Sequence, residues 1–291
     1  MSEQVQVLAR PAADLAAGKR AAGAAGRRST GVMEPRPISP WLVLLGRVGA
    51  IVGIIVAWEA LTKVGLLDAF FWSTPSAIWA TWLKTVQSGA AVSDTWYTFR
   101  STLLGFALGT GLGAAIGLSF WWSRYWARIV EPLLIAFHAM PKLALAPIVV
   151  LVFGLDLPSK VAMAVALTIV VTAISAYSGV RSVDPDLERL LFSLGANRWQ
   201  VFTKVVVPWS MPWVISALRL NIGLALSGAI VGEFIGSREG LGRMIAYAGQ
   251  TYEISLIWVG VLVLSVLSLV LYAIVGQIER ILLRGVLHED K

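Results

Sequence analysis

Long apolar runs that are almost free of charge are the feature that most constrains how this 291-residue chain folds. The hydrocarbon core of a bilayer is about 30 Å thick, so a helix needs about 20 apolar residues to cross it. Lipid offers the backbone no hydrogen-bond partners, and each crossing segment must therefore be helical. With 57% hydrophobic residues, the sequence predicts an all-α, polytopic membrane protein with about six transmembrane helices. The predicted spans are residues 42–61, 101–122, 129–154, 161–180, 213–235 and 254–276.

The distribution of Lys and Arg predicts the orientation. Basic residues are concentrated before residue 48, in the connection that follows residues 101–122, in residues 181–208 and near the C-terminus. The positive-inside rule places these segments, and with them both termini, in the cytoplasm. The net charge of +7 therefore reflects topology and does not indicate nucleic-acid binding. The chain has no cysteine, which excludes disulfides and thiolate metal sites.

The composition changes near residue 40. Residues 1–40 are rich in Ala, Gly, Arg and Pro and lack the apolar core of a cleavable signal peptide. We expect a disordered cytoplasmic tail there, with a regulatory or lipid-binding role of Arg27 and Arg28 as the alternative. Residues 41–291 form the predicted transmembrane domain.

A regular glycine spacing marks the second predicted span. Glycines recur at every fourth position and so share one helix face, which lets a neighbouring helix approach closely. Gly111 lies off that stripe. We predict a tight helix–helix contact at Gly105, Gly109, Gly113 and Gly117.

The third predicted span is interrupted by prolines. Pro141 and Pro147 bracket a segment that contains Lys142, so the helix should kink or split near Met140. A lysine that faces lipid at mid-depth costs about 2.5–3.5 kcal/mol. Lys142 is therefore expected either to snorkel to the interface or to face an interior such as a translocation path.

Polar side chains in the fifth span are further candidates for a path. Arg219 and Glu233 lie near opposite ends of that span, where snorkelling is expected of them. Asn221 and Ser227 either line a path or bond a neighbouring helix. The candidate path residues are Pro141, Lys142, Pro147, Asn221, Ser227 and Glu233. Residues 237–253 are expected to form an outer loop.

The polar segment 181–208 is predicted to form two short helices. Asp184 followed by Pro185 favours a helix start, and Gly195 ends that helix. A second helix is expected from residue 199 to 206 and should stop at Pro208. The first helix carries an apolar stripe of Leu187, Leu190, Leu191 and Leu194. An exposed apolar face of this kind favours docking of a soluble partner.

Several stretches carry a family resemblance. Gly195 precedes Val205-Val206-Val207-Pro208 at the spacing of a known loop motif, and SVDPDL, SLGANRWQVF and GEFIG (residues 182–187, 193–202 and 232–236) are typical of one branch. From about residue 98 to 283 the chain resembles the permease subunit of binding-protein-dependent ABC importers, in the branch for nitrate, taurine, alkanesulfonates and thiamine precursors. The chain departs from the family's Glu-Ala-Ala triplet, which is Arg189-Leu190-Leu191 here, with Glu188 one position earlier.

The resemblance implies a type I ABC importer fold in the bacterial inner membrane. It implies that two copies of the permease enclose a path, that a periplasmic binding protein delivers a small solute, and that ABC ATPase subunits bind and hydrolyse ATP. This chain would then be no enzyme and hold no cofactor. It has no phosphate-binding loop, because its only Gly-Lys pair, Gly18-Lys19, lacks the required neighbours. The coupling residues implied are Glu188, Arg189, Leu190, Leu191, Leu194, Gly195, Ala196, Phe202 and Pro208.

Two other functions compete with this one. An ion-coupled secondary transporter requires carboxylates near mid-membrane, whereas those of this chain fall near span ends, at Glu59, Glu131, Asp156 and Glu233. A membrane anchor that recruits a soluble enzyme would explain the polar hairpin but not the proline-broken span.

Overall fold

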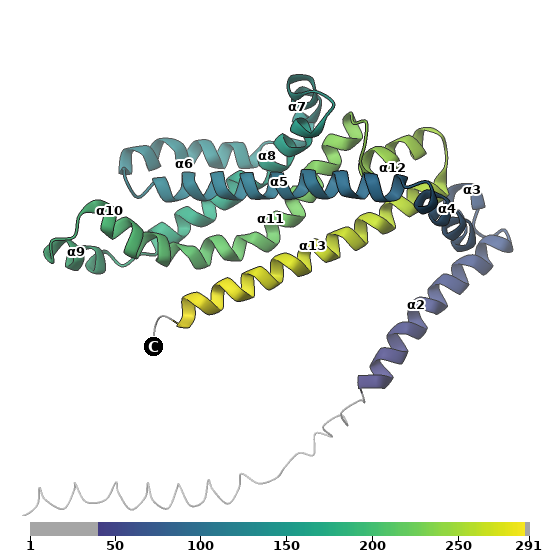
Figure 1. Cartoon of the computed structure of the whole chain (residues 1–291), viewed down its shortest axis with the longest axis horizontal. Helices are drawn as coiled ribbons and strands as arrows, with labels where there is room; N and C mark the ends of the chain where they lie inside the picture. The colour runs from purple at the N-terminus through teal and green to yellow at the C-terminus, as the bar shows by residue number, and fades with distance from the viewer. Residues whose placement is uncertain (1–39, 289–291) are drawn as a thin grey trace, which may run out of the picture. The chain divides into compact units, whose positions relative to one another are not determined.

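The computed structural model describes residues 40–288, and every regular element in that range is a helix (Figure 1). Contacts divide the chain into two units, Met1–Ile55 and Val56–Lys291. The first unit contributes the beginning of α2 (Pro40–Lys63), and the second contains all later helices. The predictions for the tail, including Arg27 and Arg28, lie outside the described residues.

The predicted membrane spans are confirmed as helices of sufficient length and apolar character. Five helices qualify alone, and a bent pair brings the number to six. The single helices are α2, α5 (Ala90–Ser119), α8 (Leu157–Arg181), α11 (Val207–Ile235) with the turns that precede it, and α13 (Ile254–His288). The bent pair is α6 (Arg124–Ala139) with η1 (Lys142–Leu145) and α7 (Ala146–Phe153).

The break in the third span falls where the prolines predict it. The two halves meet at 84°, and Met140 between them has an extended backbone. Pro141 follows this extended residue, because a residue before proline avoids the helical region. Pro147 causes no break, since it lies in the first turn of α7, where no helical N–H is required.

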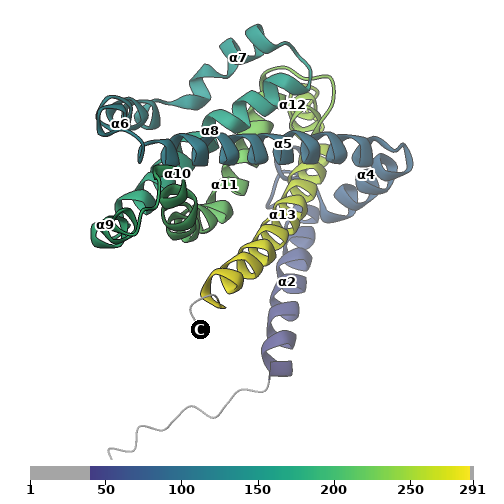
Figure 2. The same ribbon diagram turned by 60° about the vertical axis from the view of Figure 1, so that its left-hand side comes forward.

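The glycine stripe of α5 packs directly on α8, as predicted. A Cβ atom added at Gly105 or Gly109 would overlap the side chain of Ala164 or Thr168. At Gly113 and Gly117 it would overlap backbone carbonyl oxygens of α8. A Cβ at Gly228 of α11 would likewise lie 2.8 Å from the Ala164 Cα of α8. Helices α5, α8 and α11 thus form a closely packed trio, which runs side by side in Figures 1 and 2.

Pro208 does not stop a helix, contrary to the sequence-based expectation. α10 (Arg198–Val201) passes through a π-turn, η2 (Phe202–Val206), straight into α11. The Val207 N–H bonds the Phe202 carbonyl, five residues back, and this wider turn makes room for the proline ring. One continuous helix of 38 residues therefore runs from Arg198 to Ile235.

Short helices complete the second unit. They are α3 (Ala69–Trp72), α4 (Pro75–Gln87), α9 (Pro185–Ser193) and α12 (Leu241–Gln250). The expectation that residues 237–253 form a loop is wrong for most of the segment, because α12 occupies residues 241–250. Leu241, Met244 and Ala248 of α12 are buried and recur at helical spacing. They belong to the core with α11 and α13, so this segment is packed.

Candidate functional site

The hairpin formed by residues 181–208 is preorganised by its own polar side chains. The Asp184 carboxylate accepts the Asp186 N–H at 2.9 Å and caps α9. Gly195 has a φ of +86°, a left-handed conformation that ends the helix and suits glycine. Asn197 and Gln200 form a reciprocal capping box at the start of α10, with bonds of 2.8 and 2.9 Å. The chain therefore builds a defined hairpin.

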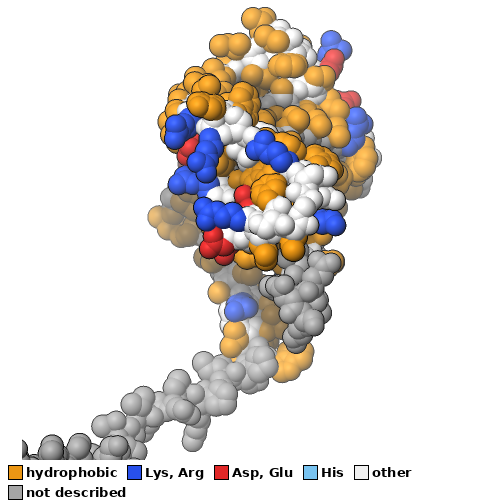
Figure 3. Space-filling view, turned by 90° about the vertical axis from the view of Figure 1, so that its left-hand side faces the viewer, with side chains coloured by type: hydrophobic (Ala, Val, Ile, Leu, Met, Phe, Trp, Pro, Cys, Tyr) orange, Lys and Arg blue, Asp and Glu red, His pale blue; other side chains and the backbone are white. Residues whose placement is uncertain are grey.

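The hairpin exposes an apolar face. Leu190 and Leu194 are 55% and 74% exposed, and the Leu187 and Leu191 side chains are half-buried. A hollow of about 280 Å³ lies beside them, between the two short helices. Lys and Arg side chains gather around apolar patches on this end of the molecule (Figure 3). The residues that line the hollow are Leu191, Leu194, Gly195, Ala196, Gln200 and Lys204.

An aromatic cluster fastens the hairpin to the turn between α5 and α6. The rings of Trp121 and Trp122 from that turn pack on Phe202, with centroid distances of 5.6 and 5.3 Å. Trp199 packs on Trp122 and Phe202, and the Arg198 guanidinium lies over both Trp121 and Trp122. Sequence reasoning identified Phe202 but not the two tryptophans, whose position just after a span was the available signal.

Glu188, which lies one position before the replaced triplet Arg189-Leu190-Leu191, has a defined partner in the structure. The Glu188 carboxylate accepts the indole N–H of Trp121 at 3.0 Å and so points toward the α5–α6 turn. Arg189 is 79% exposed and, among the residues that the structure describes, pairs with the similarly exposed Asp186 at 3.0 Å. The Glu188 side chain therefore holds the hairpin against the α5–α6 turn, while Arg189 faces solvent.

Trp121→Phe is expected to loosen the hairpin while keeping its aromatic packing. The substitution removes the indole donor to Glu188, a charge-assisted bond that at this half-buried site is worth about 1 kcal/mol. Amide hydrogen exchange in α9 should then be about fivefold faster. Trp126→Phe is the matched control, because the indole N–H of Trp126 donates to the Ser119 hydroxyl across the α5–α6 turn and not to the hairpin. Equal exchange in both variants would contradict the bracing role.

Lys142 neither snorkels nor lies in open space in this subunit. Its side chain is 8% exposed, and its ammonium group donates to the His138 carbonyl at 3.0 Å. That carbonyl belongs to the last turn of α6, where it has no helical partner. Lys142 therefore closes the broken end of α6, while Pro141 and Pro147 are exposed on either side of it. Path lining by these three residues stays a prediction.

The polar residues of α11 fall on different faces. Asn221 is fully buried and donates to the hydroxyls of Thr110 and Thr172, at 3.3 and 2.6 Å. It bonds neighbouring helices, which is one of its two predicted roles. Ser227 is exposed and bonds back to the Gly223 carbonyl of its own helix. Because Ser227 lies on an exposed face of α11, it remains a candidate to line the path.

The two charged residues of α11 do not snorkel freely. Glu233 is 1% exposed and accepts bonds from the Thr98 hydroxyl and the Gly242 N–H, at 3.0 and 2.8 Å. The snorkelling prediction for Glu233 is therefore wrong, because α12 covers it. Arg219 pairs with Glu279 of α13 at 2.5 Å, with its side chain 36% exposed. Sequence reasoning missed Glu279, which lies beyond the predicted end of the last span.

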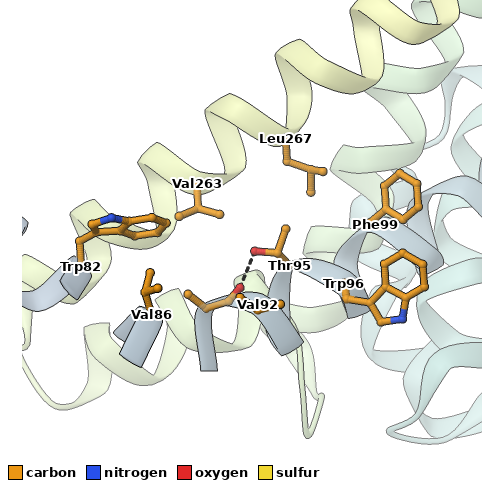
Figure 4. A pocket seen from close by; sticks show the side chains of 9 residues that line it. Trp82, Val86, Val92, Thr95, Trp96, Phe99, Val263 and Leu267 are labelled. Atoms are coloured by element: carbon orange, nitrogen blue, oxygen red, sulfur yellow. Dashed lines mark hydrogen bonds between the residues drawn. The ribbon is translucent and has the colours of Figure 1, made fainter. Parts of the chain in front are cut away.

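A second hollow of the described residues is almost wholly apolar (Figure 4). It measures about 520 Å³ and lies between α4, α5 and α13. The Thr95 hydroxyl at its edge already donates to the Ala91 carbonyl. The apolar lining suits an apolar group better than a polar solute. The lining residues are Trp82, Val86, Ala91, Val92, Thr95, Trp96, Phe99, Val263 and Leu267.

Comparison with known proteins identifies the family. The model of a protein family described as "Binding-protein-dependent transport system inner membrane component" matches residues 107–287. These residues include the broken span, the hairpin, α11 and α12. This chain belongs to that family. The permease has 36% identity over 231 residues to the riboflavin transport system permease protein RibX of Chloroflexus aurantiacus, covering 79% of this chain and 86% of the relative. It has 29% identity to the putative aliphatic sulfonates transport permease protein SsuC of Bacillus subtilis, covering 79% and 84%.

Solved structures support the same fold. A chain of a bacterial ABC transporter involved in import of the polysaccharide alginate matches with a TM-score of 0.59 at 17% identity, covering 82% of this chain and 95% of that one. A chain of the inward-facing MetNI methionine ABC transporter matches with a TM-score of 0.54 at 18% identity, covering 64% and 93%. The predicted type I importer fold and the predicted branch are thus confirmed.

The molecule is the permease subunit of an ABC importer and a multi-pass membrane protein. The family assignment leaves no support for the ion-coupled alternative or for a membrane anchor without transport. Among residues 40–288, no group of three His, Asp or Glu side chains is placed to hold a metal ion.

Proposed function

We propose that the hairpin docks this permease onto an ABC ATPase subunit, which binds and hydrolyses the ATP. The supporting observation is an exposed leucine face on a hairpin whose own geometry is fixed by caps and by the aromatic cluster. An apolar face held in one conformation loses little entropy on binding, and this favours a specific partner. The coupling residues would then be Leu190, Leu191, Leu194, Gly195 and Ala196, with Glu188, Phe202 and Trp121 holding the hairpin in place. Arg189 lies at the edge of the docking face.

We further propose that two copies of the permease enclose the translocation path in the bacterial inner membrane. The α5–α8–α11 trio is filled with buried side chains, and this supports a path outside it, along a face shared with a second copy. Ser227, Pro141 and Pro147 are exposed in the single subunit and are candidates to line that path, with Lys142 buried between the two prolines. Asn221 and Glu233 hold helices together instead.

The solute is proposed to be a small organic molecule delivered by a periplasmic binding protein. Two relatives at 36% identity are named for transport of riboflavin and of formylaminopyrimidine. Both compounds contain a pyrimidine-type ring. Planar nitrogen heterocycles of this size are therefore the first solutes to test.

Reconstitution of the permease with its ATPase and binding protein in sealed vesicles tests the proposal. Uptake of the binding protein's ligand is expected only with all three components and ATP, and it should be unaffected when ionophores collapse ion gradients. Omitting the ATPase should reduce uptake to the level of empty vesicles. Gradient-driven uptake without the ATPase would overturn the proposal.

A further inference from the structure

The start of α12 is capped by side chains of other helices. A helix begins with N–H groups that have no partner within the helix. Gly240 at the start of α12 has no side chain with which to cap it. Instead the Gly240 N–H donates to Asp94 at 2.8 Å, and the Leu241 N–H donates to the Thr98 hydroxyl at 2.9 Å. The Gly242 N–H donates to Glu233 at 2.8 Å.

These three acceptors come from two transmembrane helices and are almost fully enclosed. Asp94 and Thr98 belong to α5 and are 6% and 0% exposed, and Glu233 belongs to α11 and is 1% exposed. The Thr98 hydroxyl proton is shared between Glu233 at 3.0 Å and the Asp94 carbonyl of its own helix at 3.1 Å, and the first of these bonds joins α5 to α11. Carboxylates at a helix N-terminus are further favoured by the helix dipole.

Two glycines make this close approach possible. A Cβ at Gly240 would lie 2.6 Å from a carboxylate oxygen of Glu233, and one at Gly242 would lie 2.8 Å from the Glu233 Cβ. Gly240 also has a φ of +111°, which side chains rarely tolerate. The Gly-Leu-Gly sequence therefore brings the backbone of α12 against Glu233.

The segment between α11 and α12 is held at its other end by Lys160. This fully buried ammonium group of α8 donates to the carbonyls of Gly236 and Leu155 and to the Ser159 hydroxyl. The connection from Gly236 to Gly240 is thus fixed by α8 at one end and by α5 and α11 at the other. The bonds to Glu233 account for the glutamate of the GEFIG motif, and a Cβ at its second glycine, Gly236, would lie 2.7 Å from the Leu155 Cδ2.

We infer that Glu233, Thr98 and Asp94 are positioning residues that make α12 move as one body with α5 and α11 during transport. The α12 end lies opposite the docking hairpin in this unit, so movement of α11 at the hairpin would carry α12 with it. The inference concerns contacts within this chain and stands whether or not the hairpin binds the ATPase.

Distance measurements in the assembled importer test the inference. Because the natural chain has no cysteine, Val92→Cys in α5 and Tyr247→Cys in α12 give two clean spin-label sites, both exposed. The distance between the labels should be the same without nucleotide and with trapped ATP. A difference of more than about 5 Å between the two states would overturn the inference, because α12 would then shift relative to α5.

A matched pair of variants tests the cap itself. Thr98→Val keeps the shape of the side chain but removes the hydroxyl, and Thr98→Ser keeps the hydroxyl. Amide exchange at residues 240–242 should rise about tenfold in the valine variant and remain unchanged in the serine variant. In Thr98→Val and Glu233→Gln the label distance should also differ between the two nucleotide states.

Glu239→Gln serves as the control for loss of charge, because Glu239 is an exposed acid of the same connection. It should leave both amide exchange and the label distance unchanged. Exchange at residues 240–242 that is equal in the valine and serine variants would overturn the capping role.

Discussion

Leu194→Asp is expected to release the ATPase from this permease without unfolding it. The Leu194 side chain is 74% exposed, so a charge there costs the isolated subunit little. In a docked complex the same charge would be buried against the partner. Loss of an apolar anchor in an interface costs about 2 kcal/mol or more, which corresponds to about 30-fold weaker binding. Co-purification with the ATPase and ATP-driven uptake in vesicles are the measurements.

The neighbouring glycine provides a sharper test of the same face. Gly195→Pro forces φ to about −65° where the hairpin requires +86°, and removes the N–H that bonds the Phe192 carbonyl. Gly195→Asn is the matched control, because asparagine tolerates the left-handed region. Uptake should fail with Pro and with Leu194→Asp but persist with Asn and with Leu194→Met. Wild-type co-purification and uptake in the first two variants would refute docking through this hairpin.

Gly113→Val is expected to have the largest effect on stability. Its Cβ would overlap the Ile169 carbonyl oxygen and lie 2.7 Å from the Thr172 Cβ. Separation of α5 from α8 would also break the bridge in which Asn221 bonds both Thr110 of α5 and Thr172 of α8. Overpacking at a backbone contact costs about 3 kcal/mol, and the thermal midpoint of the purified protein should fall sharply.

Gly111→Val is the control within the same helix. A Cβ there meets nothing within 4 Å, so the thermal midpoint should stay close to that of the natural protein. Both variants should still insert into the membrane, since neither adds a polar group. Similar thermal midpoints for the two variants would contradict the tight contact between the glycine stripe of α5 and α8.

Local patterns in the sequence predicted much of the fold. Apolar length predicted the spans, the Asp184–Pro185 pair predicted the start of α9, and the four-residue glycine spacing predicted the α5–α8 contact. Each depends on residues close together in the chain. The helical spacing of Leu241, Met244 and Ala248 was equally local, and it would have revealed α12.

Contacts between distant residues were beyond such reasoning. Asp94 and Thr98 are separated from Gly240 and Leu241 by more than a hundred residues, and only the folded chain brings them together. Glu233 lies near the end of its predicted span, which favours snorkelling, whereas the helix that covers it, α12, follows later in the chain. Pro208 was expected to end a helix because proline usually does so. The wider π-turn before it instead accommodates the pyrrolidine ring of Pro208 within the helix.

That π-turn has a mechanical consequence. Because Pro208 leaves the helix unbroken, the 38 residues from Arg198 to Ile235 act as one rod, about 57 Å long at 1.5 Å per residue. A tilt of only about 10° at one end displaces the other end by about 10 Å. A small rotation imposed at the hairpin would thus be amplified into a solute-sized displacement at Glu233.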